Sequence, residues 1–315
     1  EQIICLCGCM AQRPEIAEKV RTSYRHVDMV FGPQAMWKFP ELLYRVYTRR
    51  GRVFSVEEEH GTIAEGMPVV REGRTRAWVS IMYGCNNFCS YCIVPYVRGR
   101  ERSRAPEKIV EEVRQLAAEG FKEITLLGQN VNSYGKDLPE PWDFADLLRE
   151  LDKIDGDYLI RFMSSQPKDA SYKLFDTRAQ SRHVAHQLHL PVQSGSSRVL
   201  KAMNRHYDRE SYLDEVRRLK ALIPDIVLTS DIIVGFPGET QEGFKETLSM
   251  LLAALKNKAI DKRADLTPEE EFEVVKKEIK QTKETMDLAP ADRTDIIDQC
   301  KARLAVLSEF APEEM

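Results

Sequence analysis

Residues 84–96 read Gly84-Cys85-Asn86-Asn87-Phe88-Cys89-Ser90-Tyr91-Cys92-Ile93-Val94-Pro95-Tyr96. Three cysteines at the spacing C-x3-C-x2-C follow the apolar run 78–83 and precede a proline. Thiolates this close together bridge one another with difficulty, but they can all bind a single metal cluster. A cubic iron–sulfur cluster takes four ligands, which are usually cysteine thiolates. Three local cysteines would therefore leave one iron open to a substrate or cofactor.

The same spacing also fits an ordinary helical core. Positions i, i+4 and i+7 share one face of a helix, and free cysteine is often a small buried apolar residue. Gly84, the Asn86-Asn87 pair and Pro95 are turn formers, which argues against a continuous helix here. Short cysteine spacing in a chain that is not secreted also favours a metal site over a disulfide. The stretch therefore predicts a cluster rather than a helical core.

Length and composition set wider limits. The chain has 315 residues, of which 43% are hydrophobic, enough for two or more domains with buried cores. No charged-then-apolar signal segment opens it, and no apolar run approaches the length of a membrane span. Its seven cysteines, an odd number, suit a reducing compartment. We therefore expect a cytoplasmic protein without a membrane partner, while the sequence gives no indication of its oligomeric state.

The first part of the chain alternates strand and helix patterns, as an α/β unit does. The strand patterns cover residues 2–7 and 27–31, and the helical patterns cover residues 14–20 and 36–47. Residues 51–76 are rich in charge, glycine and proline, without a sustained period. We expect them to connect this unit to a second domain.

Three cysteines near the start are not equivalent. Cys5 and Cys7 lie on one face of the predicted first strand, so packing in the core is expected of both. Cys9 follows Gly8, where the strand should end and a loop begin. Cys9 is therefore the one of the three that a loop could present to a ligand.

From residue 77 onward, five strand patterns alternate with five helical patterns. The strands are expected at 77–83, 123–127, 158–163, 187–191 and 226–234, and the helices at 106–119, 144–153, 197–204, 209–222 and 241–250. This alternation predicts right-handed βαβ crossovers and a parallel sheet, either open or closed into a barrel. In such sheets, sites gather at the carboxyl ends of the strands. Small and polar residues follow every predicted strand: the cysteine loop and residues 128–130, 164–165, 193–196 and 235–239.

Several motifs resemble one enzyme family. Cys85-x3-Cys89-x2-Cys92, with an aromatic residue before the last cysteine, resembles the signature of the radical S-adenosylmethionine (SAM) enzymes. The longer run 79–104 is similar to the methylthiotransferases. The most specific matches, to the MiaB-type tRNA enzymes, are Leu127-Gly128-Gln129-Asn130-Val131-Asn132-Ser133-Tyr134 and Leu188-His189-Leu190-Pro191-Val192-Gln193-Ser194-Gly195-Ser196. The resemblance covers about residues 1–249.

The resemblance implies a set of cofactors. Cys85, Cys89 and Cys92 would hold a 4Fe–4S cluster whose open iron binds S-adenosylmethionine. An electron from an external donor would cleave that cofactor to a 5′-deoxyadenosyl radical. The candidates for holding the cofactor are Tyr91, Gln129, Asn130, Ser165, Gln193, Asp231 and Val234.

A second 4Fe–4S cluster belongs to the complete family. Gly8-Cys9-Met10-Ala11-Gln12 resembles the last of three cysteines that hold this auxiliary cluster. The other two would lie upstream of the sequence, so Cys9 alone cannot hold it. Two further family features, a sixth barrel strand and a small RNA-binding β-domain, do not follow residue 250.

The alternating arginines Arg98, Arg100, Arg102 and Arg104 are candidates for charge recognition. Guanidinium groups match the geometry of phosphate and carboxylate, so these residues could guide RNA phosphate or pair with the cofactor carboxylate. The alternation also suits the solvated edge of a sheet.

Residues 251–315 have a different character: they are charged, they carry the acidic excess of the chain and they have almost no strand signal. Helices are expected at 251–262, 267–285 and 293–310. The runs 251–257 and 291–295 resemble the YqeY family, a helical domain similar to the tail of a tRNA-dependent amidotransferase subunit. The expected domains are an amino-terminal methylthiotransferase part, a partial radical-SAM (β/α) barrel and an all-α tail, at 1–65, 66–249 and 250–315.

The resemblance implies a tRNA methylthiotransferase. Such an enzyme adds a methylthio group to carbon 2 of N6-isopentenyladenosine next to the anticodon, using S-adenosylmethionine and iron–sulfur clusters. The anticodon loop suits this chemistry, because its unstacked bases can enter a pocket. Two alternatives stay open: a catalytically incomplete RNA-binding or amidotransferase-associated module, and a different radical enzyme with one cluster.

Overall fold

The computed structural model describes residues 2–49, 51–56, 63, 65, 66, 69–71, 73, 75–261, 282, 283, 286, 300, 301 and 304. The chain divides into two compact units, 1–247 and 248–315. The expected helices at 267–285 and 293–310 lie almost wholly outside the described residues. Among the residues described, no helix combines the length and the apolar character that a membrane span requires.

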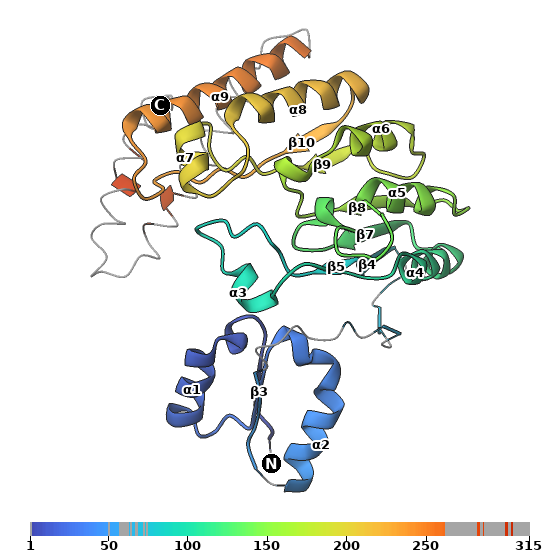
Figure 1. Ribbon diagram of the computed structural model, residues 1–315, viewed down its shortest axis with the longest axis vertical. Helices are drawn as coiled ribbons and strands as arrows, with labels where there is room; N and C mark the ends of the chain where they lie inside the picture. The colour runs from blue at the N-terminus through green and yellow to red at the C-terminus, as the bar shows by residue number, and fades with distance from the viewer. Residues whose placement is uncertain are drawn as a thin grey trace, which may run out of the picture. The chain divides into compact units, whose positions relative to one another are not determined.

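The amino-terminal part is a small parallel sheet with a helix on each face (Figure 1). The strands β1 (Cys5–Cys7), β2 (Met29–Phe31) and β3 (Val53–Ser55) pair in the order β1-β2-β3. The helical elements are η1 (Met10–Gln12), α1 (Pro14–Ser23), η2 (Pro33–Lys38) and α2 (Phe39–Arg49). Met29 and Leu42 are almost fully buried between the sheet and α2. The expected α/β unit is confirmed.

Three sequence expectations for this part were wrong. Residues 53–55 form β3 rather than connector, because they pair with the buried strand β2. Residues 33–38 form a 3-10 helix that precedes α2, so the predicted helix 36–47 begins with a different geometry. Cys5 and Cys7 are exposed rather than packed in the core, since β1 is the edge strand.

Five parallel segments form the second part of the fold. The strands β4 (Arg76–Ser80), β7 (Glu123–Leu127) and β8 (Leu159–Phe162) are adjacent in one sheet, and β9 (Gln187–His189) pairs with β10 (Val227–Thr229). A parallel bridge between Ile160 and Val184 joins the two groups. Figure 1 shows the strands following one another with helices along their outer side. This is the partial barrel that the alternating pattern predicts.

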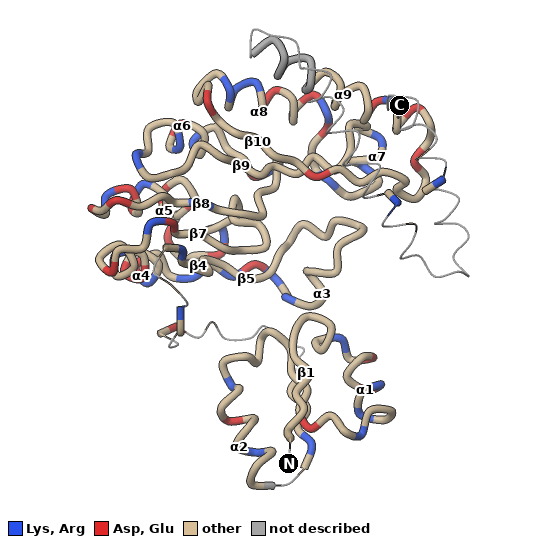
Figure 2. Tube along the Cα trace, turned by 180° about the vertical axis from the view of Figure 1, so that it is seen from behind, with Lys and Arg blue, Asp and Glu red and all other residues tan. Residues whose placement is uncertain are grey.

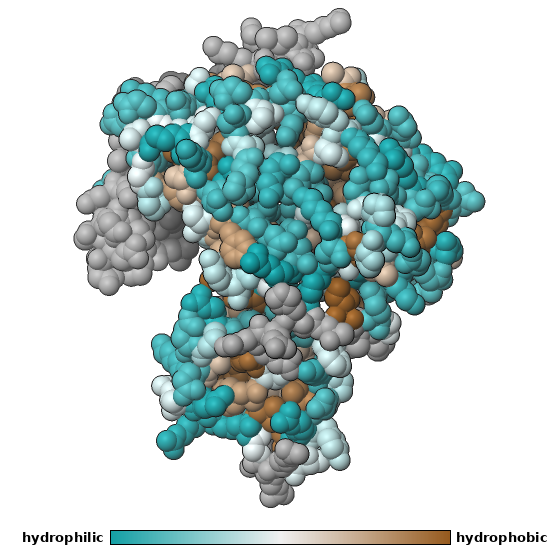
Figure 3. Space-filling model, in the orientation of Figure 1, coloured by the Kyte–Doolittle hydropathy of each residue, from teal (hydrophilic) through white to brown (hydrophobic). Residues whose placement is uncertain are grey.

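The helical elements of this part follow the strands along the chain, and most of them lie along the outer side of the sheet (Figure 1). They are α3 (Val94–Arg98), α4 (Pro106–Ala118), η3 (Val131–Ser133), α5 (Phe144–Asp152), η4 (Pro167–Asp169), α6 (Tyr172–Gln180), α7 (Ser197–Ala202), α8 (Arg209–Leu222) and α9 (Gln241–Asp261). Val79, Ile124 and Ile160, one from each of the adjacent strands β4, β7 and β8, are fully buried. Both basic and acidic residues occur along α4 and α8 (Figure 2), and the face in Figure 3 is mostly hydrophilic with small separate apolar areas.

Several boundaries in this part differ from the sequence expectation; the strand pattern 226–234, for example, is a strand only at Val227–Thr229. The predicted strand 77–83 is two strands, because the backbone of Ile81 donates to Leu127 and accepts from Arg104. The short β5 (Met82–Tyr83) then pairs antiparallel with β6 (Arg102–Ser103). The predicted helices 241–250 and 251–262 are one continuous helix, α9, since no helix breaker separates them. Helices α3 and α6 were not predicted.

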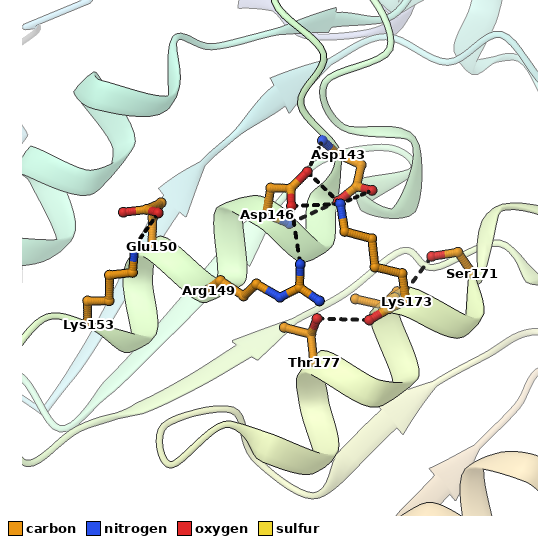
Figure 4. A network of polar contacts seen from close by, with 9 residues as sticks. Asp143, Asp146, Arg149, Glu150, Lys153, Ser171, Lys173 and Thr177 are labelled. Atoms are coloured by element: carbon orange, nitrogen blue, oxygen red, sulfur yellow. Dashed lines mark hydrogen bonds and ion pairs between the residues drawn. The ribbon is translucent and has the colours of Figure 1, made fainter.

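A polar network fixes α5 to α6 (Figure 4). The Asp143 carboxylate accepts a hydrogen bond from the backbone N–H of Asp146 (2.9 Å), and the Asp146 carboxylate accepts one from the backbone N–H of Asp143 (3.3 Å). Lys173 donates to both carboxylates, at 2.8 and 2.7 Å. The capping box thus satisfies the first turn of α5 and ties it to the next helix.

Replacing Asp143 by alanine is expected to lower the free energy of unfolding by about 1 kcal/mol near neutral pH. Burial alone would raise the pKa of this carboxyl, but hydrogen bonds from Lys173 and Asp146 leave the pKa below its ordinary value. The contribution is therefore present above the unfolded pKa of about 3.9 and is lost as the pH falls through the folded value. Urea denaturation at a series of pH values down to about pH 3 measures this loss.

The control for this prediction is Asp155→Ala. The Asp155 side chain is 98% exposed and pairs only with a surface arginine, so its removal should change stability little at any pH. A destabilisation by Asp143→Ala that stayed constant across the series would contradict the assignment.

Candidate iron–sulfur and cofactor site

The cysteine stretch is a loop between β5 and β6. Residues 84–93 form no helix, which removes the helical-core interpretation of the three cysteines. The loop starts at Gly84, whose backbone N–H donates to Gln129 Oε1 (2.6 Å), and its ends meet where Cys85 N donates to Gly99 O (3.1 Å). Cys85 and Cys89 are buried, and Cys92 is half-buried. The fold therefore places the three thiols at the carboxyl-end edge of the parallel strands.

A distant segment holds the tip of this loop. Ser90 donates from its backbone N–H to Met203 O and from its hydroxyl to Ala202 O, both at 3.1 Å. The Asn204 amide donates to Asn87 O (3.2 Å) and Phe88 O (2.9 Å). The segment 202–205, which follows α7, thus fixes the loop backbone on both sides of Cys89.

The thiols share their surroundings with two polar side chains. The Arg205 Nη1 lies 3.5 Å from Cys89 Sγ, and Arg205 is 8% exposed. Burial raises the pKa of Tyr91 to about 12, and the neighbouring thiols Cys89 and Cys92 also raise it, against the pull of Arg205. Burial likewise raises the pKa of the Cys85 thiol. Tyr91 therefore stays protonated at neutral pH beside the loop.

Two candidate cofactor residues, which follow β7 and β8, have polar atoms without a hydrogen-bond partner among the described residues. Asn130 is 1% exposed, and its Nδ2 donates to Asp169 (2.6 Å) while its Oδ1 has no partner among the described residues. The buried Ser165 hydroxyl has no partner within the same described residues. Gln129, in contrast, is engaged with the cysteine loop through Gly84. Asn130 and Ser165 therefore hold polar groups that a bound molecule could satisfy.

The other three candidates follow the last two strands. Gln193 has a positive φ of 71° and exchanges backbone hydrogen bonds with the segment after β10, donating to Asp231 O (2.9 Å) and accepting from Ile233 N (2.8 Å). The Asp231 carboxylate lies 3.3 Å from His189 Nε2. Val234 is half-buried along the same segment. The structure thus brings Gln193 and Asp231 together, and among the described residues no hydrogen bond or ion pair joins them to the cysteine loop.

Cys9 lies in the turn after β1, as expected. Its thiol accepts a hydrogen bond from Arg98 Nε (3.2 Å), and Arg98 belongs to α3 of the cysteine loop. Cys5 and Cys7 are on the neighbouring edge strand, and no group of three or more His, Cys, Asp or Glu side chains within the described ranges could hold one metal ion. Cys9 is therefore linked to the cysteine loop through an arginine.

Besides Arg98, which donates to Cys9, two of the four alternating arginines have contacts within the protein itself. Arg104 is 9% exposed and pairs with Glu65 (2.6 Å) and Glu112 (3.0 Å). The guanidinium of Arg100 lies 4.7 Å from the ring centroid of Phe88 in the cysteine loop. Arg104 is thus a buried ion-pair centre and not a contact for phosphate, which corrects one part of the charge-recognition hypothesis.

Asn204 and Arg205 are site residues that were not predicted from the sequence. Both reach the cysteine loop across 116 or more positions, and neither belongs to a motif with a recognisable spacing to the cysteines. The only local signal is the basic and polar run at residues 204–206, and such runs are usually exposed to solvent.

Two protein families match different parts of this chain. The model of the Radical SAM superfamily matches residues 79–251, more than half of the chain. The chain belongs to the radical SAM superfamily. A second model, of Yqey-like proteins, matches residues 239–315. The two resemblances expected from the motifs are therefore confirmed.

Curated relatives agree with this membership. The chain is 54% identical over 249 residues to the tRNA-2-methylthio-N(6)-dimethylallyladenosine synthase of Acetivibrio thermocellus, covering 79% of this chain and 52% of that protein. The synthase of the same name from Alkaliphilus oremlandii is 55% identical over 252 residues, with 80% and 54% covered. The chain thus spans about half the length of these relatives.

Among solved structures, the radical S-adenosylmethionine methyltransferase TsrM from Kitasatospora setae has a similar fold. It aligns with a TM-score of 0.56 at 17% identity, covering 80% of this chain and 53% of TsrM. At this identity the likeness concerns the fold alone, and it confirms the partial radical-SAM α/β architecture.

Membership in the radical SAM superfamily implies a 4Fe–4S cluster and S-adenosylmethionine. The residues present fit both groups in kind: three thiols in one loop suit iron, and the unpartnered Asn130 and Ser165 atoms suit a polar cofactor. The thiols are not gathered around one point, as ligands of a single ion would be. A cubic cluster does not require that, because each thiolate binds a different iron.

Proposed function

We propose that this chain is the radical-generating part of a tRNA methylthiotransferase of the MiaB type. The observation that carries the proposal is the C-x3-C-x2-C loop, which is free of helix and held at the carboxyl ends of parallel strands by the segment 202–205. The named relatives support the reaction: methylthio addition to N6-dimethylallyladenosine in tRNA. The three-part organisation 1–65, 66–249 and 250–315 belongs to this proposal.

In the proposed site, Cys85, Cys89 and Cys92 hold the radical-SAM cluster. When bound, that cluster supplies the electron with which S-adenosylmethionine is cleaved, and the protein supplies position and electrostatics. The buried Cys85 and Cys89 keep water away from the cluster, while the hydrogen bond from Gly84 to Gln129 ties the loop to the end of β7. Gln129 therefore acts on the cofactor through the loop.

Six other side chains complete the proposed cofactor site. Asn130 and Ser165 offer their unpartnered buried atoms as hydrogen-bond partners for the polar groups of S-adenosylmethionine. Tyr91 stays a neutral phenol beside the thiols, and Gln193, Asp231 and Val234, on the segments that follow β9 and β10, would hold the cofactor from those strand ends. The substrate is the tRNA anticodon loop, which agrees with a cytoplasmic setting, and an external donor provides the electron. Cys9 would contribute one ligand of the auxiliary cluster.

One anaerobic experiment tests the proposed function. The chain is reconstituted with iron and sulfide, iron per chain is counted, and reductant and S-adenosylmethionine are added with isopentenylated tRNA. The proposal expects about four irons at the Cys85/Cys89/Cys92 site and release of 5′-deoxyadenosine. Absence of both iron and cofactor cleavage would overturn it, and tRNA binding that persisted under those conditions would favour a non-catalytic RNA-binding module.

A further inference from the structure

Arg205 is a buried cation whose contacts are all with neutral groups. Its Nη1 lies 3.5 Å from Cys89 Sγ, its Nε donates to the Tyr207 hydroxyl (2.8 Å), and its Nη2 donates to the carbonyl of Pro191 (2.9 Å). The guanidinium also lies 5.1 Å from the ring centroid of Tyr207. In the part of the chain that the structure describes, no carboxylate forms an ion pair with Arg205.

This environment leaves the charge of Arg205 without a compensating carboxylate among the described residues. Arginine does not lose its proton inside proteins, and a buried charge is costly unless an opposite charge compensates it. Arg104 of the same fold is equally buried and has two carboxylates, Glu65 and Glu112. Among the contacts of Arg205, the Cys89 thiol ionises to a thiolate whenever it binds iron.

We propose that Arg205 is the counter-ion of the cluster-bound Cys89 thiolate and that its charge raises the reduction potential of the radical-SAM cluster. The inference rests on the proposed cluster site. Adding one electron makes the cluster more negative, and a fixed positive charge near a ligand sulfur stabilises the reduced form. The electron comes from a low-potential one-electron donor, and no bond or proton changes place. Arg205 is thus a positioning residue that acts through Cys89.

A purely structural role is the competing explanation. Through Pro191 and Tyr207, Arg205 also joins the segment 202–205 to the loop after β9. If that were its whole role, its removal would change stability and leave the potential of the cluster as it was. The reduction potential therefore separates the two explanations.

The test compares Arg205→Gln and Arg205→Lys with Arg178→Gln in the full chain. Arg178 is a matched control: it is 1% exposed and donates to the carbonyls of Ala185 and Gln187, without contacting a cysteine. Each protein is reconstituted anaerobically and titrated with dithionite and redox mediators, and the reduced cluster is counted by electron paramagnetic resonance.

For Arg205→Gln, the ratio of reduced to oxidised cluster at a fixed potential should fall about tenfold, which for one electron equals about 59 mV. Arg205→Lys, which keeps the charge, should recover most of this, and Arg178→Gln should match the wild type.

Two results would overturn the inference separately. A wild-type potential in Arg205→Gln, with four irons bound to both proteins, would refute the inference and leave the proposed function intact. A wild-type chain that binds no iron would refute both. If Arg205→Gln does not fold, Arg205→Met replaces it in the same redox titration, and a wild-type potential in Arg205→Met would refute the inference.

Discussion

Cys89→Ser abolishes iron binding at the loop and, with it, reductive cleavage of S-adenosylmethionine. The expected change is a fall from about four irons per chain to background, and a loss of 5′-deoxyadenosine by at least about a hundredfold. The reason is chemical: a serine hydroxyl does not replace a thiolate as a ligand for iron in a sulfide cluster. Iron analysis and the visible absorption of the reconstituted protein measure the first effect, and chromatography of the reaction measures the second.

The control is a cysteine of the other unit. Cys300 is buried and lies at 248–315, outside the unit that carries the loop. Cys300→Ser should leave iron content and cofactor cleavage unchanged. Equal losses from Cys89→Ser and Cys300→Ser would show that the C-x3-C-x2-C loop is not the cluster site.

Gly84→Ala prevents the loop from closing and removes iron binding without touching a ligand. Gly84 has a φ of 77°, and a Cβ there would overlap the carbonyl oxygen of Arg100 and lie 2.6 Å from that of Gly99. Both obstacles are backbone atoms, so no side-chain rotation relieves them. The expected cost is about 3 kcal/mol or more in the free energy of unfolding, because strain and overlap add together.

Gly120→Ala separates the two contributions to that cost. Gly120 ends α4 with a φ of 88°, but a Cβ there meets nothing within 4 Å. Its replacement should cost only the conformational strain, about 1 kcal/mol, and should leave iron binding intact. Chemical denaturation and iron counts on both proteins measure the difference. Similar costs for the two replacements would mean that the Arg100 carbonyl can move and that the loop is looser than its contacts indicate.

The strongest periodic patterns predicted their elements well. The strand 123–127 and the helix 209–222 were predicted with both ends correct. The first alternates buried and half-buried residues, and the second starts at the capping residue Asp208. Local chemistry alone fixes such elements, so the sequence suffices for them.

The wrong predictions concern features that the local sequence pattern does not determine. The three-residue strand β3 carries too little pattern to stand out from a linker, and it forms because β2 offers it a buried edge. Cys5 and Cys7 have the alternation of a core strand, but their position at an edge exposes them, and edge position is a property of the whole sheet.

The candidate site shows the same contrast between local patterns, which can be predicted, and long-range contacts, which cannot. The spacing of Cys85, Cys89 and Cys92 could be read because the ligands of one cluster lie in one loop. The contacts of Asn204 and Arg205 with that loop could not, since they depend on how α7 packs more than a hundred residues away. Sequence therefore identified the reactive groups, while the groups that set their electrostatic environment came from the fold.

The open arc of strands has a practical consequence for handling this protein. Within the described residues, β10 pairs only with β9, and Val227 at its start is 57% exposed. A strand edge with unpaired N–H and C=O groups is a template for adding another strand. At high concentration, copies of the chain are therefore prone to join edge to edge, and a short β-forming peptide that covers Val227–Thr229 should improve its solubility.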